Sequence, residues 1–305
     1  MTKAEFIAHY TALQWHIDLG LDEILADEPG LQMKAVATAP LPLAEAEETR
    51  VTYKTVPVTT SVAEAVNDIP AAPVTTTLQT PSLQGTPALR AEAIALAQAA
   101  NDLPTLKEAV ANFSGNPLRK TATHLVFGEG SPSAPIMLVG EAPSADDDKS
   151  GRIFSGAEGA LLDKILMATK MSRVETEGLC PIYLAHLVCW RPPGNRTPSP
   201  QEYELSLPFL ERQIELIQPR MLIFCGGNVA KFMLGTQESL SKLRNRWHSY
   251  TPNSVGRESP TAAPPIPALV TYGPANLLNT PAQKQAAWSD WLMAVEKARE
   301  LALFP

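Results

Sequence analysis

The stretch Leu138-Val139-Gly140-Glu141-Ala142-Pro143-Ser144 continues an apolar run that begins at Ile136. The run predicts a buried strand, and Gly140 and Pro143 predict a tight turn at its end. Three acids follow, and then Gly151-Arg152-Ile153-Phe154-Ser155-Gly156 precedes a helix-forming segment. Ligands of open α/β sheets bind at the carboxyl ends of the strands. This loop is therefore the first candidate for a functional site.

Four apolar runs alternate with helical segments in the C-terminal two thirds of the chain. They are Ile136 to Val139, Ile182 to Val188, Met221 to Cys225 and Ala268 to Tyr272. The helical segments cover residues 159–170, 200–217, 228–235 and 281–301. This alternation is typical of a three-layer α/β/α fold with a short, mainly parallel, four-stranded sheet. Polar or glycine-containing loops follow all four runs, so we expect them to meet at one edge of the sheet.

The N-terminal third has a different composition. Residues 1–30 show helical spacing of apolar side chains and predict an N-terminal helical segment. Residues 31–89 are rich in Ala, Pro and Thr without a period, which predicts a disordered linker. Residues 90–112 predict a further helix, and the α/β domain is expected over residues 113–305.

Charge and cysteine content restrict the class of protein. The net charge is −7, but residues 1–112 hold 6 Lys and Arg against 14 Asp and Glu, whereas the remainder holds 19 against 18. The predicted domain is thus nearly neutral and is compatible with a local basic face. No apolar run reaches the length of a membrane span. The first residues lack a signal pattern and the three cysteines lack paired spacing, so we expect a cytoplasmic protein.

The loop after the first strand offers several candidate side chains. Glu141 is suited to orienting a water or to capping the loop, and the residues alone favour neither role. Asp146-Asp147-Asp148 is predicted to be a solvated turn rather than a metal site, because no further ligands are spaced for a metal. Phe154 is either a core residue or an aromatic face on which a flat base stacks.

Two basic segments are compatible with nucleic acid. The proline-rich loop Trp190 to Pro198 carries Arg191 and Arg196, which its stiff backbone would hold in place for phosphates. The segment Lys242 to His248 carries Arg244 and Arg246 beside a tryptophan. The proline-rich loop alone could be a rigid surface turn with two solvated arginines, and a run such as Lys242 to His248 alone is most often a solvated face. Together the two segments favour DNA or RNA as a partner.

These motifs occur in the same order in a known family. Gly-Glu-Ala-Pro, the acidic run, Gly-x-x-Phe-x-Gly, Arg-Pro-Pro-Gly-Asn-Arg, Arg-x-Arg-Trp and Pro-Ala-x-Leu-Leu followed by Pro-Ala-Gln-Lys all resemble the family 4 uracil-DNA glycosylases. The resemblance covers about residues 113–295, and weakly the segment around Trp15 to Glu23. It implies a monomeric DNA-repair hydrolase of base excision, with uracil- or damage-containing DNA as its partner and no membrane association.

The resemblance also implies roles for individual residues. Such enzymes flip uracil out of DNA, stack it on an aromatic ring and let water displace it from the sugar. By position, Gly140, Glu141 and Ala142 would line the uracil pocket, and Phe154 would stack the base. The resemblance places base reading at His186 and stabilisation of the departing anion at Gly273, so the implied catalytic positions are Glu141, His186 and Gly273.

Two of these positions depart from the family pattern. His186 stands where the family has asparagine, and an imidazole cannot copy the donors and acceptor of an amide. Gly273 stands where the family has histidine, and loss of one such donor typically costs about 3 kcal/mol, or 10²–10³ in rate. Asn279 also replaces an arginine. These departures predict strongly reduced activity on uracil.

The family's iron–sulfur cluster is expected to be absent. The resemblance places its ligand positions at Asn116, Trp190 and Ser206, none of which offers a thiolate. Cys189 lies one residue from a ligand position but in a segment whose register the neighbouring motif fixes. We therefore predict no cofactor and no metal.

Two functions remain open at this point. The first is a DNA glycosylase that hydrolyses the N-glycosidic bond of uracil or of another damaged base. The second is a catalytically degenerate DNA-binding or interaction module on the same fold. A plain nucleotide-binding domain is disfavoured, because no Gly-x-Gly-x-x-Gly or phosphate-loop lysine motif is present.

Overall fold

The computed structural model describes residues 85–252 and 264–304. The predicted N-terminal segment, residues 1–30, lies outside these ranges, as does the predicted linker up to residue 84. Within the described ranges, no helix is both long enough and apolar enough to cross a bilayer.

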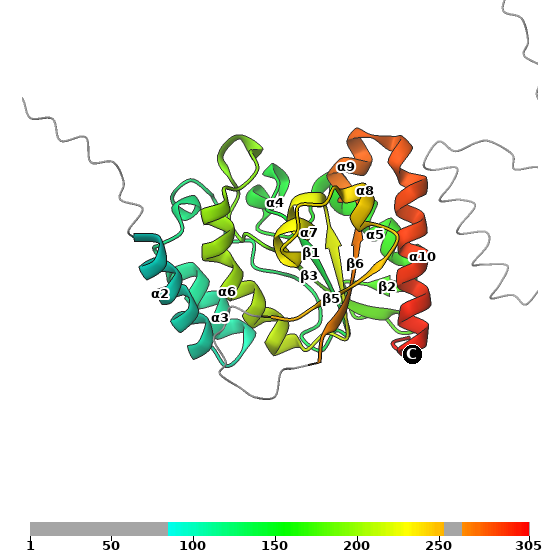
Figure 1. Ribbon diagram of the computed structural model, residues 1–305, viewed down its shortest axis with the longest axis horizontal. Coiled ribbons are helices and arrows are strands. Elements are labelled where there is room, and N and C mark those ends of the chain that lie inside the picture. The colour runs from blue at the N-terminus through cyan, green and yellow to red at the C-terminus, as the bar shows by residue number, and fades with distance from the viewer. Residues whose placement is uncertain (1–84, 253–263, 305) are drawn as a thin grey trace, which may run out of the picture. The chain divides into compact units, whose positions relative to one another are not determined.

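A six-stranded sheet forms the centre of the fold (Figure 1). The strands are β1 (Ile136–Gly140), β2 (Met171–Ser172), β3 (Cys180–His186), β4 (Met221–Cys225), β5 (Trp247–Tyr250) and β6 (Ile266–Thr271). Their order is β2-β3-β1-β4-β6-β5, and only β5 runs antiparallel to its neighbour. The predicted parallel sheet is confirmed in its four central strands.

The sheet is larger than predicted because each edge carries one additional short strand. β2 has two residues, too few to give a pattern in the sequence. β5 begins in the basic segment Lys242 to His248 and continues two residues beyond it, and its side chains are mostly polar or only half-buried. Pairing with β6, rather than local hydrophobicity, explains why this segment is extended.

Helices cover both faces of the sheet (Figure 1). They are α2 (Gly85–Ala99), α3 (Leu103–Asn112), α4 (Ala145–Ser150), α5 (Gly156–Ala168), α6 (Pro200–Ile217), α7 (Gly227–Leu234), α8 (Leu240–Leu243), α9 (Pro274–Asn279) and α10 (Lys284–Glu300). Short 3₁₀ turns occupy Pro117–Lys120, Pro193–Asn195 and Pro281–Gln283. The four predicted helices are present, with ends shifted by a few residues.

The predicted single helix over residues 90–112 is wrong. Two helices, α2 and α3, cover this region, and α2 begins at Gly85 inside the segment predicted to be linker. The break lies at Asp102, whose carboxylate accepts a hydrogen bond from the Thr105 amide at 2.8 Å and caps α3. Pro104 then occupies the first turn, where its missing N–H costs nothing.

Two apolar clusters lie on opposite faces of the sheet. Met137 and Val139 face α2, α3, α6 and α7, so the helices before residue 113 share their core with the sheet. Leu138 and Leu184 face the other way, toward α5, α9 and α10. This alternation follows from the period of two along a strand. It assigns the last residue of each strand to a definite face.

The register of β1 and β3 brings two predicted site residues together. Gly140 pairs with His186 at the carboxyl end of both strands. Both follow the alternation of Leu138 and Leu184, so His186 projects on the α5 side of the sheet. The sheet therefore places His186 beside the start of the loop of residues 141–156.

Candidate functional site

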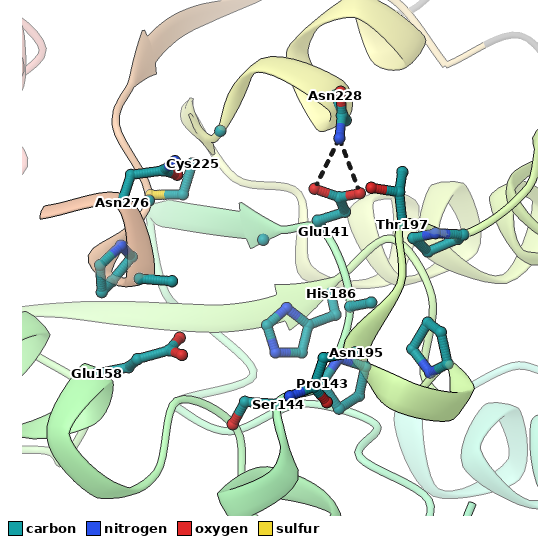
Figure 2. Close-up of a pocket in the computed structure, with 18 of the residues that line it drawn as sticks. Glu141, Pro143, Ser144, Glu158, His186, Asn195, Thr197, Cys225, Asn228 and Asn276 are labelled. Atoms are coloured by element: carbon teal, nitrogen blue, oxygen red, sulfur yellow. Dashed lines mark hydrogen bonds between the residues drawn. The ribbon is translucent and has the colours of Figure 1, made fainter. Parts of the chain in front are cut away.

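A cavity of about 550 Å³ lies at the carboxyl edge of the sheet (Figure 2). The loops after β1, β3, β4 and β6 all line it, so the predicted convergence of these four loops is confirmed. The lining residues are Gly140 to Ser144, Phe154, Glu158, His186, Pro192, Asn195 to Pro198, Cys225 to Asn228, Gly273 to Asn276 and Asn279. A space of this volume can hold a nucleobase with part of its sugar.

Gly140 is a glycine because two rings pack against its backbone. A Cβ atom built there would lie 2.5 Å from Nδ1 of His186 and 2.7 Å from Cζ of Phe154. The two rings also contact each other, with centroids 4.7 Å apart and planes tilted by 57°. The bare Gly140 backbone thus permits a Phe154–His186 pair to form one wall of the cavity.

The backbone of Phe154 adopts a conformation that non-glycine residues rarely occupy. Its φ is +47°, in the left-handed region. Arg173 holds the loop in this shape by donating to the carbonyl oxygens of Ile153 at 2.8 Å and Phe154 at 3.4 Å. Local strain sustained by a buried arginine indicates that the orientation of the Phe154 ring matters to the site.

The acidic run is not the solvated turn that the sequence predicts. It forms α4, and Asp147 and Asp148 are buried, whereas Asp146 is exposed. Asp147 and Ser144 make a reciprocal capping box, and the other Asp147 oxygen accepts from the Ser155 amide at 2.6 Å. One carboxylate therefore ties the start of α4 to the loop that carries Phe154.

Asp147 also reaches His186. Its Oδ2 lies 3.4 Å from Nε2 of the imidazole, and both side chains are almost fully buried. Burial opposes ionisation of Asp147, but His186 and the Ser155 and Ser144 amides outweigh it and lower the pKa of this carboxyl. Nδ1 of His186 has no hydrogen-bond partner among the described residues. A ligand donor that reached this nitrogen would relieve a cost of about 1–3 kcal/mol.

Glu141 is held from outside its own loop. Its carboxylate accepts from the Tyr203 hydroxyl at 2.5 Å. It also accepts from the Asn228 amide at 3.1 and 3.3 Å (Figure 2). Burial and the adjacent Glu141 raise the pKa of Tyr203, so this phenol stays a donor. The sequence left two roles open for Glu141, orienting a water or capping its own loop. The hydrogen bonds to Tyr203 and Asn228 do not fit the capping role. The carboxylate is instead fixed at the cavity by α6 and α7.

Glu158 projects into the cavity from the first turn of α5. Figure 2 shows its carboxyl group directed toward the side on which the His186 ring lies. Burial, Asp147 and Asp146 all raise its pKa. Among the described residues it makes no hydrogen bond or ion pair. An unpaired carboxyl group in a cleft, with a perturbed pKa, is a common mark of a functional residue.

Gly273 lies two residues after β6, at the N-cap of α9, and has an ordinary backbone. Its φ is −71° and its ψ is 153°, which any residue adopts. A Cβ atom there would meet the Asn276 side chain at 3.4 Å and the Cys225 carbonyl oxygen at 3.7 Å, which are normal contacts. Neither the backbone nor the local packing therefore requires glycine at this position of the cavity wall.

The arginines predicted to contact DNA differ in their surroundings. Arg196 lines the cavity and pairs with Glu202 through two hydrogen bonds of 2.7 and 2.8 Å. Arg191 lies in the same loop, bonded to Asn195 and partly exposed. These two remain candidates for phosphate contact.

Arg244 and Arg246 lie outside the cavity lining. Arg244 is 10% exposed, pairs with the buried Asp290 at 2.7 Å and stacks on Tyr272. Its Nε and Nη2 groups donate inside the fold, to Asp290 and to the Ala286 carbonyl oxygen, which does not fit the predicted phosphate contact. Arg246 is exposed and pairs with Glu238.

Two of the three positions implied for the iron–sulfur ligands come together, but the chemistry of the three does not fit a cluster. Asn116 donates from its amide to the Ser206 hydroxyl at 3.2 Å in a buried contact, and Trp190 is also buried. Amide, hydroxyl and indole groups are not the thiolates that such clusters need. Among the described residues, no three His, Cys, Asp or Glu side chains are grouped to hold a metal ion.

Sequence reasoning missed several residues of the site. Asp147 was hidden in an acidic run that resembles a solvated turn, although the Ser144–Asp147 spacing is a capping signal. Glu158 lies in the first turn of α5, where the buried apolar positions dominate the sequence pattern and nothing marks the acid as a site residue. Tyr203 contacts the site through Glu141, and no local pattern marks it. Asn228 lines the cavity in the loop after β4, but its hydrogen bond to Glu141 has no local signal.

Comparison with known proteins agrees with this geometry. A family model described as the uracil DNA glycosylase superfamily matches residues 127–292. The type-4 uracil-DNA glycosylase of Pyrobaculum aerophilum is 33% identical over 196 residues, which cover 63% of this chain and 92% of that protein. The corresponding protein of Sulfurisphaera tokodaii is 32% identical over 209 residues, 67% of this chain and 87% of its own length. The one from Thermotoga maritima is 35% identical over 140 residues, 46% and 70% respectively. The chain therefore belongs to the uracil-DNA glycosylase superfamily and, within it, to the type-4 family.

Proposed function

We propose that this protein binds DNA, takes a flipped base into the cavity and hydrolyses the N-glycosidic bond of uracil or of another damaged base. In this reaction the bond between C1′ and the base nitrogen breaks, and its electron pair leaves with the base. The water oxygen bonds to C1′, and a proton of that water neutralises the departing base. The products are a free base and an abasic site.

The observation that carries this proposal is the cavity itself. Loops from four parallel strands enclose a space of about 550 Å³ with an oriented carboxylate, Glu141, on one wall and the Phe154–His186 pair on another. Binding a base in such a space requires that it leave the DNA stack. Arg196 at the rim is suitably placed for a phosphate of the extruded nucleotide.

A second candidate is a DNA-binding module without hydrolytic activity. The specific observation in its favour is Gly273, which adds no side-chain donor to the cavity wall. The charge that develops on a departing base is commonly stabilised by such donors. A protein that kept the cavity but lacked the donor would bind a base without releasing it.

One assay separates the two candidates. Single- and double-stranded oligonucleotides that carry one uracil, hypoxanthine or xanthine are incubated with the protein, and abasic sites and bound complexes are both quantified. Abasic sites above the level of an undamaged oligonucleotide support the glycosylase. Preferential binding without abasic sites supports the module. If the protein neither forms abasic sites nor binds the modified oligonucleotides preferentially, both candidates lose their support.

A further inference from the structure

Glu158 lines the cavity with a carboxyl group that no contact within the described residues accounts for. It is half-buried in the first turn of α5 (Gly156–Ala168), and a helix N-terminus by itself favours an ionised carboxylate. The other acid on the cavity wall, Glu141, accepts hydrogen bonds from two side chains. Glu158 has no such partner among the described residues, although it points into the same space (Figure 2).

The groups around Glu158 disfavour its charge. Asp146 and Asp147 face it from α4, and both act to raise its pKa, as does burial. His186 faces it from β3 and is engaged with Asp147. The nearby Arg173 is occupied by Asp163 and by the carbonyls of Ile153 and Phe154, and α9 carries no titratable side chain.

A neutral carboxyl group and a carboxylate recognise different hydrogen-bonding partners. It presents one O–H donor and one carbonyl acceptor side by side, whereas the ionised form presents acceptors alone. A base edge with a carbonyl oxygen beside a ring N–H complements the neutral form at both atoms. The ionised form would set its lone pairs against the base carbonyl and repel it. A base that entered would also exclude water and further favour the neutral form.

We propose that Glu158, in its neutral form, contacts the base in this cavity by donating a hydrogen bond to a base carbonyl oxygen and accepting one from the adjacent ring N–H. This assigns the recognition of a lactam-edged base to a residue on α5. The inference rests on the proposed base-binding function and specifies which group reads the base.

The test uses the full-length protein and a single-stranded oligonucleotide with one 2′-fluorinated deoxyuridine, which resists hydrolysis. Its affinity is measured from about pH 5 to pH 9, relative to the same oligonucleotide with 2′-fluorinated deoxycytidine, whose base has no ring N–H beside its carbonyl oxygen. We expect the preference of the unaltered protein for the uracil probe to decline as pH rises through the pKa of Glu158. Glu158→Gln keeps a donor and an acceptor without a proton to lose, so its preference should be high and independent of pH.

Two further variants sharpen the result. Glu158→Ala removes both groups and should reduce the preference by at least about tenfold at pH values below the pKa of Glu158, the value of one to two hydrogen bonds. Asp146→Asn removes an exposed negative neighbour and should move the pH midpoint downward. Glu177→Gln removes one exposed negative charge away from the cavity and serves as the matched control, with no expected change.

The possible outcomes are distinguishable. If the unaltered protein prefers uracil but Glu158→Ala keeps that preference, or Glu158→Gln keeps the same pH dependence, the role of Glu158 is refuted and base binding stands. If the unaltered protein shows no preference at any pH and no abasic sites arise from uracil, hypoxanthine or xanthine, the proposed function fails, and the role of Glu158 fails with it. Circular dichroism of each variant establishes that a lost preference does not reflect unfolding.

Discussion

His186 and Asp147 form a buried contact between the end of β3 and the start of α4, with Nε2 and Oδ2 3.4 Å apart. The same carboxylate binds the amides of Ser144 and Ser155. Asp147 is therefore a positioning residue, because it fixes both the imidazole and the loop that carries Phe154. The two rings of the cavity wall depend on one acid.

The substitution Asp147→Asn should make the free energy of unfolding less dependent on pH in the acidic range. The folded pKa of Asp147 is lowered from 3.8, so its stabilising contribution is present above that value and is lost as pH falls toward the folded pKa. We expect Asp147→Asn to cost about 1–3 kcal/mol near neutral pH, and less as the pH falls below 3.8. Urea unfolding of both proteins over this range measures the difference. A constant difference at all pH values would contradict the assignment.

Gly140→Ala should damage the cavity wall. The new methyl group would lie 2.5 Å from His186 Nδ1 and 2.7 Å from Phe154 Cζ, so the rings must separate. We expect a loss of about 1–3 kcal/mol in unfolding free energy together with weaker binding of uracil-containing DNA. Gly273→Ala is the matched control at another glycine of the cavity lining, since its methyl group meets only ordinary contacts from 3.4 Å. Equal effects of the two substitutions would refute this explanation.

The combined substitution Gly273→His and His186→Asn should increase uracil excision. The backbone at Gly273 accepts any residue, and a histidine there would add a donor to the cavity wall. One well-placed donor is commonly worth about 10²–10³ in rate. Single-turnover release of uracil from an oligonucleotide measures the change. Gly273→Leu at the same position adds bulk without a hydrogen-bond donor and is the control, and no gain in the double variant would count against the roles implied for both positions.

Arg244→Ala should destabilise the fold rather than weaken DNA binding specifically. Asp290 would keep its buried carboxylate without the guanidinium, and loss of one partner of a buried pair typically costs about 3–5 kcal/mol. The exposed Arg246–Glu238 pair is the control, because Arg246→Ala should change stability by less than about 1 kcal/mol. Thermal or denaturant unfolding distinguishes the two. Full stability of Arg244→Ala with reduced DNA affinity would restore the predicted phosphate contact.

Arg191→Ala should reduce the salt dependence of DNA binding. Arg191 is partly exposed in the stiff loop beside the cavity, bonded to Asn195. Loss of one phosphate contact lowers the slope of log K against log salt by about 0.7–0.9. Titrations at several salt concentrations give this slope, with the exposed Arg119→Ala as the control away from the cavity. An unchanged slope for Arg191→Ala would remove it from the DNA interface.

The central strands could be predicted from the sequence because continuous apolar runs are buried on both faces. β1 and β4 are buried at every position, and their runs stand out without reference to any partner. β5 could not be predicted in this way. Its residues are half-polar, and only its pairing with β6 makes the segment extended.

The same distinction separates the predicted and the missed parts of the site. Loop convergence follows from the order of strands and loops along the chain, so the cavity could be placed in advance. The burial of Asp147 and the outward pairing of Glu141 with Tyr203 depend on contacts across 39 and 62 residues of sequence. The structural role of Arg244 likewise depends on Asp290, 46 residues away. Contacts between residues so far apart in the sequence cannot be predicted from a local pattern.

The hydrogen bond between Asn116 and Ser206 has a consequence for how the protein is made. Ser206 also donates to the Glu202 carbonyl oxygen, so neutral polar groups connect the segment before β1 to α6. Ligation by thiolates would instead make maturation depend on iron supply and on cluster delivery, and would expose the fold to oxidants. We expect this chain to reach its native state in iron-depleted cells and to withstand peroxide without loss of structure.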